Sequence, residues 1–217
     1  MNFHTARSNM VSQQVRPWHV LNEQVLATLA QVPRENFVPL AFHNLAYSDT
    51  DIPLSEGQTM LSPKVVGRAL QALNLTSHDK VLEVGTGTGY MTACLAHLAN
   101  EIISVEIQPT LLGQAQINLS ALNLRNLTLS QGDAVFGWDD FAPYDAIVVT
   151  GSYPLGVPEK ICEQLKVGGR LFTITGLAPT MKAILIERKA KEFTSTSLFE
   201  TVVPALIHAP QPKKFQF

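Results

Sequence analysis

Three glycines at alternate positions form the first arrangement in this chain that could support chemistry. Gly85, Gly87 and Gly89 lie in EVGTGTGY (83–90), between an apolar run and a segment with helical spacing. Glycine has no Cβ, so such a loop can turn tightly and bring its backbone close to a ligand. The spacing G-x-G-x-G differs from the dinucleotide fingerprint G-x-G-x-x-G, which disfavours a nicotinamide-linked oxidoreductase. A tight turn without a ligand is the alternative interpretation.

Two carboxylates follow the next two apolar runs, where a nucleoside would need them. Glu106 ends IISVE (102–106), and an acid there can accept hydrogen bonds from both ribose hydroxyls. Asp133, which follows LTLSQG (127–132), can accept from an adenine amino group. The alternatives are a solvated charge for Glu106 and a turn cap for Asp133. The glycine loop and the two acids together predict a nucleoside-binding site.

Strands and helices must alternate to position these residues. We predict a C-terminal β-hairpin from two long strands, and a glycine turn at 166–169 ahead of the last core strand. This order predicts an α/β fold with a Rossmann-like, doubly wound, mostly parallel sheet, whose ligand lies at the carboxyl ends of the central strands. The predicted strands are 80–87, 102–106, 127–133, 145–151, 170–175, 183–189 and 192–199, and the predicted helices are 91–99, 111–122 and 158–165.

The N-terminal third has a different pattern. Asn22 is a plausible cap for a helix at 22–32 that Pro33 ends, and 62–73 has helical spacing again. The segments between them are rich in Pro, Asp and Gly. We therefore expect residues 1–77 to be an N-terminal helical and loop cap on the substrate side, in the same domain as a core at 78–217.

Composition narrows the class of protein. Of 217 residues 46% are hydrophobic and 16% charged, which predicts a sizeable core, and the net charge of −2 argues against a nucleic-acid partner. Cys94 and Cys162 lack metal-ligand spacing and are expected to be buried free thiols in a reducing compartment, so we expect no metal. The first 16 residues lack the apolar core of a signal peptide, and no apolar run reaches membrane-spanning length. We expect a soluble, cytoplasmic monomer.

The motifs and their order resemble a class I S-adenosylmethionine-dependent methyltransferase, and within that class the protein-L-isoaspartate (D-aspartate) O-methyltransferase family. The resemblance runs from about residue 8 to 206. It implies S-adenosylmethionine as methyl donor, S-adenosylhomocysteine as product, and an isoaspartyl carboxylate of a peptide or protein as acceptor. It is carried by MVSQQVR (10–16), VPRENFVP (32–39), AYSDTDIPL (46–54), EGQT (56–59), LEVGTGTGYMTACLA (82–96), GDAVFGW (132–138), APYDAIVVT (142–150) and LKVGGRL (165–171).

The predicted cofactor contacts follow the glycine loop and the two acidic positions. They are Glu83, Gly85, Thr86, Gly87, Gly89, Tyr90, Glu106, Ile107, Asp133 and Ala134.

One loop departs from the family's usual G-Q-T-I-S-Q-P, whose serine lies beside donor and acceptor. Here residues 57–63 read GQTMLSP, so Leu61 occupies the serine position and Ser62 follows it. Thr59 and Ser62 are the predicted catalytic candidates, although Ser62 before Pro63 is typical of a helix N-cap. A carboxylate is already ionised at neutral pH and needs no general base, so we expect Leu61 to weaken methyl transfer rather than to abolish it.

Two alternative functions follow from these departures. The segment 149–158 replaces a shorter, alanine-rich turn of the family, so the acceptor pocket of this chain could differ. The first alternative is therefore a class I methyltransferase with a different acceptor. The second is a non-catalytic S-adenosylmethionine-binding protein that uses the N-terminal cap to hold a partner.

Overall fold

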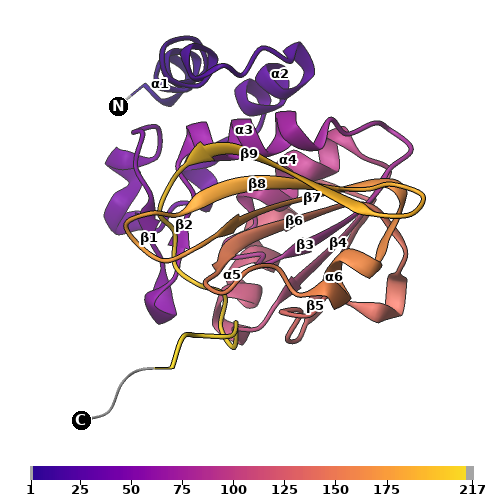
Figure 1. Cartoon of the computed structure of the whole chain (residues 1–217). Coiled ribbons are helices and arrows are strands. Elements are labelled where there is room, and N and C mark those ends of the chain that lie inside the picture. The colour runs from indigo at the N-terminus through magenta and orange to yellow at the C-terminus, as the bar shows by residue number, and fades with distance from the viewer. Residues whose placement is uncertain (1, 214–217) are drawn as a thin grey trace.

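The computed structural model describes residues 2–213, and a seven-stranded sheet runs through its centre (Figure 1). The strands lie in the order β5-β4-β3-β6-β7-β8-β9. Neighbours from β5 to β7 are parallel, whereas β7-β8 and β8-β9 are antiparallel. The predicted mostly parallel sheet with a hairpin edge is thus confirmed. The strands are β3 Lys80–Val84, β4 Glu101–Glu106, β5 Leu127–Gln131, β6 Tyr144–Tyr153, β7 Leu165–Thr175, β8 Lys182–Arg188 and β9 Phe193–Glu200.

Helices cover both faces of this sheet because side chains alternate along each strand. Val81 and Ala146 belong to one buried cluster, together with side chains of α2, α3, α4 and α5. Leu82 and Ile147 belong to the cluster on the other face, together with α6. The helices are α2 Glu23–Gln31, α3 Pro63–Leu73, α4 Tyr90–Leu98, α5 Pro109–Ser120 and α6 Glu159–Glu163.

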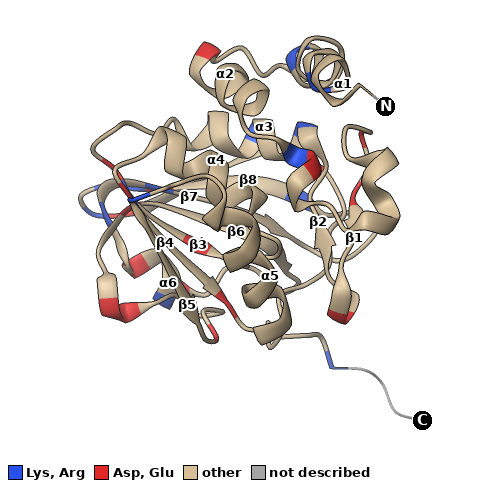
Figure 2. Cartoon of the chain, turned by 180° about the vertical axis from the view of Figure 1, so that it is seen from behind, with Lys and Arg blue, Asp and Glu red and all other residues tan. Residues whose placement is uncertain are grey.

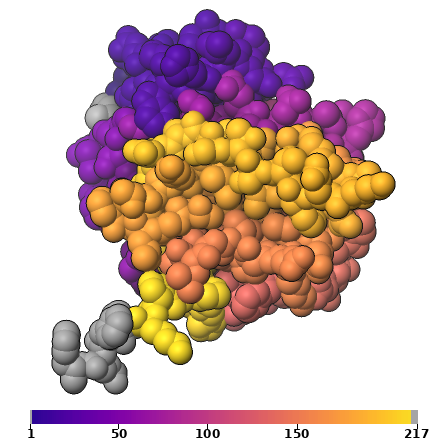
Figure 3. All heavy atoms as spheres, viewed as in Figure 1, coloured from indigo at the N-terminus to yellow at the C-terminus, as the bar shows by residue number. Residues whose placement is uncertain are grey.

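The N-terminal segment packs directly on this core (Figure 3). The predicted cap of α2 is confirmed, because the Asn22 side chain accepts from the N–H groups of Gln24 and Val25. The N-terminal segment also contains short helical and strand segments that we did not predict. These are α1 Phe3–Asn9, η1 Met10–Val15, η2 Arg16–Trp18, η3 Arg34–Phe37, η4 Leu40–Leu45, β1 Ile52–Pro53, η5 Ser55–Gly57 and β2 Thr59–Met60.

Helix α1 was missed for a physical reason. None of its residues is fully buried, and only Phe3 and Ala6 pack against the core, so its apolar stripe is too short to predict a helix. It is held instead by Arg7, which donates to the carbonyls of Ala30 and Gln31 and pairs with Glu35 at 2.9 Å. Contacts of this kind leave no local pattern in a sequence.

The predicted glycine turn at 166–169 is wrong. These residues belong to β7, which pairs with β6 both before and after them, at Tyr144–Leu165 and Ala146–Arg170. The register shifts between the two pairs, and Gly168 has a φ of +85°. The glycines therefore make a bulge in a continuous strand rather than a turn that precedes it.

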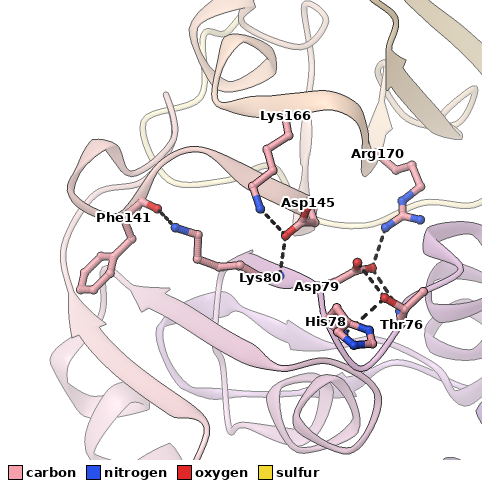
Figure 4. A network of polar contacts seen from close by, with 8 residues as sticks. All are labelled: Thr76, His78, Asp79, Lys80, Phe141, Asp145, Lys166 and Arg170. Carbon is pink, nitrogen blue, oxygen red and sulfur yellow. Dashed lines mark hydrogen bonds and ion pairs between the residues drawn. The ribbon is translucent and has the colours of Figure 1, made fainter.

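A network of charges closes the amino ends of the central strands (Figure 4). The carboxylate of Asp145 accepts from the Lys80 N–H at 2.8 Å and pairs with Lys166 at 2.7 Å. Arg170 pairs with Asp79 at 2.7 Å. These contacts tie β3, β6 and β7 together at the end of the sheet opposite to the predicted ligand site.

Charged residues are spread over separate segments of the rear face rather than gathered in one block (Figure 2). No helix among residues 2–213 has the length and apolarity needed to cross a membrane.

Candidate active site

A cavity lies at the carboxyl ends of β3, β4, β5 and β6, where the sequence predicted the ligand. The loop at 54–61 forms one wall, and residues near the C-terminus form another. Its lining comprises Leu54, Gln58, Thr59, Met60, Leu61, Val66, Val84, Gly85, Thr86, Gly87, Thr88, Tyr90, Met91, Val105, Glu106, Ile107, Leu111, Gly132, Asp133, Ala134, Val135, Thr150, Gly151, Pro204, Leu206 and Ile207.

The three glycines of the 85–89 loop lie in different surroundings. Gly85 and Gly87 line the cavity, and a Cβ on Gly85 would overlap the hydroxyl of Thr150. Gly89 does not line it. With φ at +94°, a Cβ there would lie 2.9 Å from Leu119, so Gly89 allows α4 to pack closely on α5. Gly85 and Gly87 therefore lie at the cavity, where we predicted a ligand contact, and Gly89 does not.

Glu106 is held rigidly with its carboxylate at the cavity. The side chain is buried, its Oε2 accepts the Gly87 N–H at 2.8 Å, and its Oε1 accepts the Gln108 N–H at 3.0 Å. Each carboxylate oxygen can accept a second hydrogen bond. Glu106 can therefore bind two neighbouring hydroxyls without losing its backbone partners.

Asp133 lies where it can both cap a turn and contact a ligand in the cavity. Its Oδ1 accepts the Val135 N–H at 3.1 Å, which is the turn cap, while the residue also lines the cavity. Its Oδ2 lies 2.8 Å from Nδ1 of His208. Sequence reasoning missed His208, because no local pattern connects positions 75 residues apart.

Glu83 is not where the sequence predicted it. Because side chains alternate along β3, Glu83 points to the face that α4 covers and does not line the cavity. It is fully buried, and Oε2 accepts from the hydroxyls of Thr92 at 2.5 Å and Ser104 at 2.6 Å. Burial raises the pKa of Glu83 to about 8. A hydrogen bond of 2.6 Å between Ser104 and Thr86 links this carboxyl to the back of the glycine loop.

The other predicted cofactor contacts do line the cavity: Thr86, Tyr90, Ile107 and Ala134. Tyr90 is informative because its hydroxyl is buried and has no hydrogen-bond partner within residues 2–213. A buried hydroxyl without a partner costs free energy. Tyr90 lines the cavity as predicted, while its hydroxyl lies buried behind the cavity wall.

The loop at 54–61 brings Thr59 and Leu61 to the cavity, but the following residue, Ser62, does not line it. Ser62 occupies the N-cap position of α3, yet its side chain makes no capping hydrogen bond. The prediction of a serine cap is therefore right in position and wrong in hydrogen bonding. Ser62 is held through its backbone, because its N–H donates to Oδ1 of Asp51 at 2.7 Å.

A C-terminal strap, residues 201–209, closes the cavity on the side of β6. Ser152 donates its N–H to the Pro204 carbonyl and accepts from the Leu206 N–H, both at 3.0 Å. Pro204, Leu206 and Ile207 line the cavity, and we did not predict them. The strap packs closely on β6, since a Cβ on Gly151 would lie 2.8 Å from Leu206.

Comparison with known proteins shows relatives along nearly the whole chain. The protein-L-isoaspartate O-methyltransferase of Picosynechococcus sp. is 45% identical over 170 residues, covering 78% of this chain and 76% of the relative. Protein-L-isoaspartate O-methyltransferase 1 of Syntrophobacter fumaroxidans is 36% identical over 198 residues, covering 91% and 92%.

Solved structures agree on the fold. A protein-L-isoaspartate O-methyltransferase superposes with a TM-score of 0.79 at 25% identity, covering 94% of this chain and 66% of that one. A Plasmodium falciparum structure described as the same type of enzyme, in complex with S-adenosyl-L-homocysteine, has a TM-score of 0.79 at 21% identity, covering 95% and 99%. The sequence model of the protein-L-isoaspartate(D-aspartate) O-methyltransferase family matches residues 5–205. The chain belongs to this family.

Proposed function

We infer that this protein is an S-adenosylmethionine-dependent carboxyl O-methyltransferase that acts on L-isoaspartyl or D-aspartyl residues of damaged proteins. The observation that carries this inference is the family match over residues 5–205, in a chain whose cavity presents the glycine loop and two acids at adjacent strand ends. S-adenosylmethionine, when bound, would supply a methyl group activated by a positively charged sulfur.

The chain's own residues fit this cofactor. Gly85 and Gly87 let the backbone approach the cofactor closely, and Glu106 is placed to accept from two ribose hydroxyls. Asp133 and Ala134 lie at the end of the neighbouring strand, where an adenine would be. These assignments are proposals that rest on the cavity lining and on hydrogen-bonding capacity.

The proposed acceptor end of the cavity, at residues 59–61, has one side-chain hydroxyl and no acid or base, which fits methyl transfer to a carboxylate. An ionised carboxylate needs placement against the methyl carbon and partial desolvation, not a proton acceptor. Thr59 can donate a hydrogen bond to such a carboxylate, whereas Leu61 offers only an apolar wall. We therefore propose that this protein methylates isoaspartyl residues more slowly than it would with a serine at position 61.

We further propose that the protein works as a cytoplasmic monomer on peptide and protein acceptors, and not on nucleic acid. The net charge of −2 and the scattered basic residues support a non-nucleic substrate. The two buried free thiols support a reducing compartment.

Labelled S-adenosylmethionine tests the function directly when offered with an isoaspartyl peptide, its aspartyl counterpart and a cell extract. We expect base-labile label on the isoaspartyl peptide and none on the aspartyl control. Label in the extract alone would favour a methyltransferase with a different acceptor, as the apolar Leu61 in the wall would allow. Cofactor binding without any transfer would indicate a binding protein.

A further inference from the structure

The peptide bond that follows Leu61 is gripped at both of its polar ends. Nη2 of Arg34 donates to the Leu61 carbonyl at 2.8 Å, and Oδ1 of Asp51 accepts the Ser62 N–H at 2.7 Å. The two groups belong to one planar unit, because the carbonyl of residue 61 and the N–H of residue 62 share a peptide bond. A cation thus holds one edge of this plane and a carboxylate holds the other.

Burying the charged side chain of Arg34 costs free energy, so packing alone does not account for it. It is fully buried, and no carboxylate of residues 2–213 lies within ion-pair distance of it. Burying a charge without a direct counter-ion costs free energy that an apolar side chain of similar volume would avoid. Its guanidinium instead donates to the carbonyls of Ala46 and Leu61 and lies 4.8 Å from the ring centre of Tyr90.

The two gripping residues come from different segments. Arg34 begins η3, whereas Asp51 precedes β1. The grip therefore fixes the Leu61–Ser62 peptide relative to two parts of the N-terminal region at once. The plane contains the Cα of residue 61, so holding the plane in place restricts where side chain 61 can point, and this side chain lines the cavity together with Thr59.

We propose that Arg34 and Asp51 are positioning residues that orient side chain 61 toward the methyl acceptor. This rests on the proposed function, because it takes the cavity wall at 59–61 to be the acceptor end. We call the two contacts, Arg34 to the Leu61 carbonyl and the Ser62 N–H to Asp51, the backbone clamp; they do not involve the side chain at 61. Serine at this position would then be presented to the acceptor in the direction that leucine now occupies.

The test is a double-mutant cycle between Asp51 and Leu61. Asp51 is used because it is only partly buried, so Asp51→Ala is more tolerable than truncation of the buried Arg34. Asp51→Asn keeps an oxygen that can accept the Ser62 N–H. Asp49→Ala is the matched control, since Asp49 lies two residues from Asp51 and pairs with Lys64 at 2.6 Å.

Three quantities are measured: kcat/KM on an isoaspartyl peptide, the Kd for S-adenosylhomocysteine, and hydrogen exchange of the Ser62 amide. We expect Leu61→Ser to raise kcat/KM about ten- to hundredfold alone or with Asp49→Ala, but less than about threefold with Asp51→Ala. Asp51→Asn is expected to retain most of the gain. The Kd is expected to stay within about twofold, and Ser62 exchange to accelerate at least about tenfold in Asp51→Ala only.

An equal gain from Leu61→Ser with and without Asp51→Ala would overturn the proposal, and so would unchanged exchange at Ser62. If no variant methylates the isoaspartyl peptide, the proposed function is wrong, and hydrogen exchange of the Ser62 amide alone then tests the clamp. Faster exchange in Asp51→Ala then supports the clamp, and unchanged exchange overturns it.

Discussion

The two ends of the same central strands use carboxylates in opposite ways. At the amino ends, Asp79 and Asp145 each pair with a basic side chain (Figure 4). At the carboxyl ends, Glu106 and Asp133 accept backbone N–H groups, and within residues 2–213 neither pairs with Lys or Arg, although Oδ2 of Asp133 also lies 2.8 Å from Nδ1 of His208. The paired acids have their charge neutralised by the fold. The acids at the cavity keep charge and lone pairs available for a ligand.

The pKa of Asp145 reflects this difference. Partial burial alone would raise it, but the hydrogen bonds from Lys166 and the Lys80 N–H outweigh burial and lower it below its usual value. Glu83 lies behind the cavity without a basic partner, and burial raises its pKa to about 8. A basic partner therefore lowers the pKa of Asp145, whereas burial without one raises the pKa of Glu83.

The largest expected effect comes from an isosteric change at the cavity. Glu106→Gln removes the charge from the group that we expect to accept the ribose hydroxyls. Losing charge-assisted hydrogen bonds worth about 1.5–3 kcal/mol would weaken S-adenosylhomocysteine binding about 10- to 100-fold by calorimetry. The matched variant Asp79→Asn, at the other end of the strands, is expected to leave the Kd within about twofold. Equal losses in both variants would remove the functional distinction between the two ends.

An effect of similar size is expected at Leu61, in the cavity wall at 59–61. Leu61→Ser restores a hydroxyl that can donate to the acceptor carboxylate and would raise kcat/KM on an isoaspartyl peptide about ten- to hundredfold. Leu61→Ala removes the apolar side chain without adding a donor. If Leu61→Ala gives the same gain as Leu61→Ser in steady-state assays, the cause is space and not the hydrogen bond.

The buried carboxyl predicts an unusual pH dependence of stability. With the folded-state pKa of Glu83 raised to about 8, its contribution is fully present below the unfolded pKa, near 4.3, and is lost as pH rises toward 8. In urea unfolding between pH 5 and 8, we expect the free energy of unfolding of Glu83→Gln to fall about 3–4 kcal/mol less than that of the wild type. The exposed control Glu192→Gln would keep the wild-type slope. Parallel slopes for all three proteins would contradict the assignment.

A smaller effect is expected at the amino-end network. Asp145→Ala removes the partners of Lys166 and of the Lys80 N–H and would lower the free energy of unfolding by about 1 kcal/mol at pH 7. Because its folded-state pKa is depressed, this contribution is present above about pH 4 and is lost as pH falls further. Glu187→Ala, in the more exposed pair with Lys189, is the control with almost no loss. A loss that persists undiminished at pH 3 would not come from the ion pair.

The smallest effect is expected at Ser62. Its hydroxyl caps nothing, so Ser62→Ala is expected to cost less than about 0.5 kcal/mol in chemical denaturation. Asn22→Ala removes a side chain that accepts two N–H groups at the start of α2 and is expected to cost about 1 kcal/mol. Equal costs at the two positions would mean that Ser62 does cap α3 in solution.

The elements predictable from sequence were those with a local cause. Alternation and glycine spacing located the core strands, the loop at 85–87 and the strand-end acid Glu106. Glu83 was misassigned because it lies beside the glycines in sequence but points to the opposite face of its strand. His208 and the contacts of Arg34 were unpredictable for another reason, since they join residues 75 and 27 positions apart.

The most direct test of the central claim is a crystal structure of the protein with S-adenosylhomocysteine. We expect the ribose hydroxyls to donate to the carboxylate of Glu106, the adenine to lie beside Asp133 and Ala134, and the sulfur to face the wall formed by Thr59 and Leu61. The amino-end acids would keep their basic partners. A nucleoside bound elsewhere, or one that leaves Glu106 without a contact, would contradict the account.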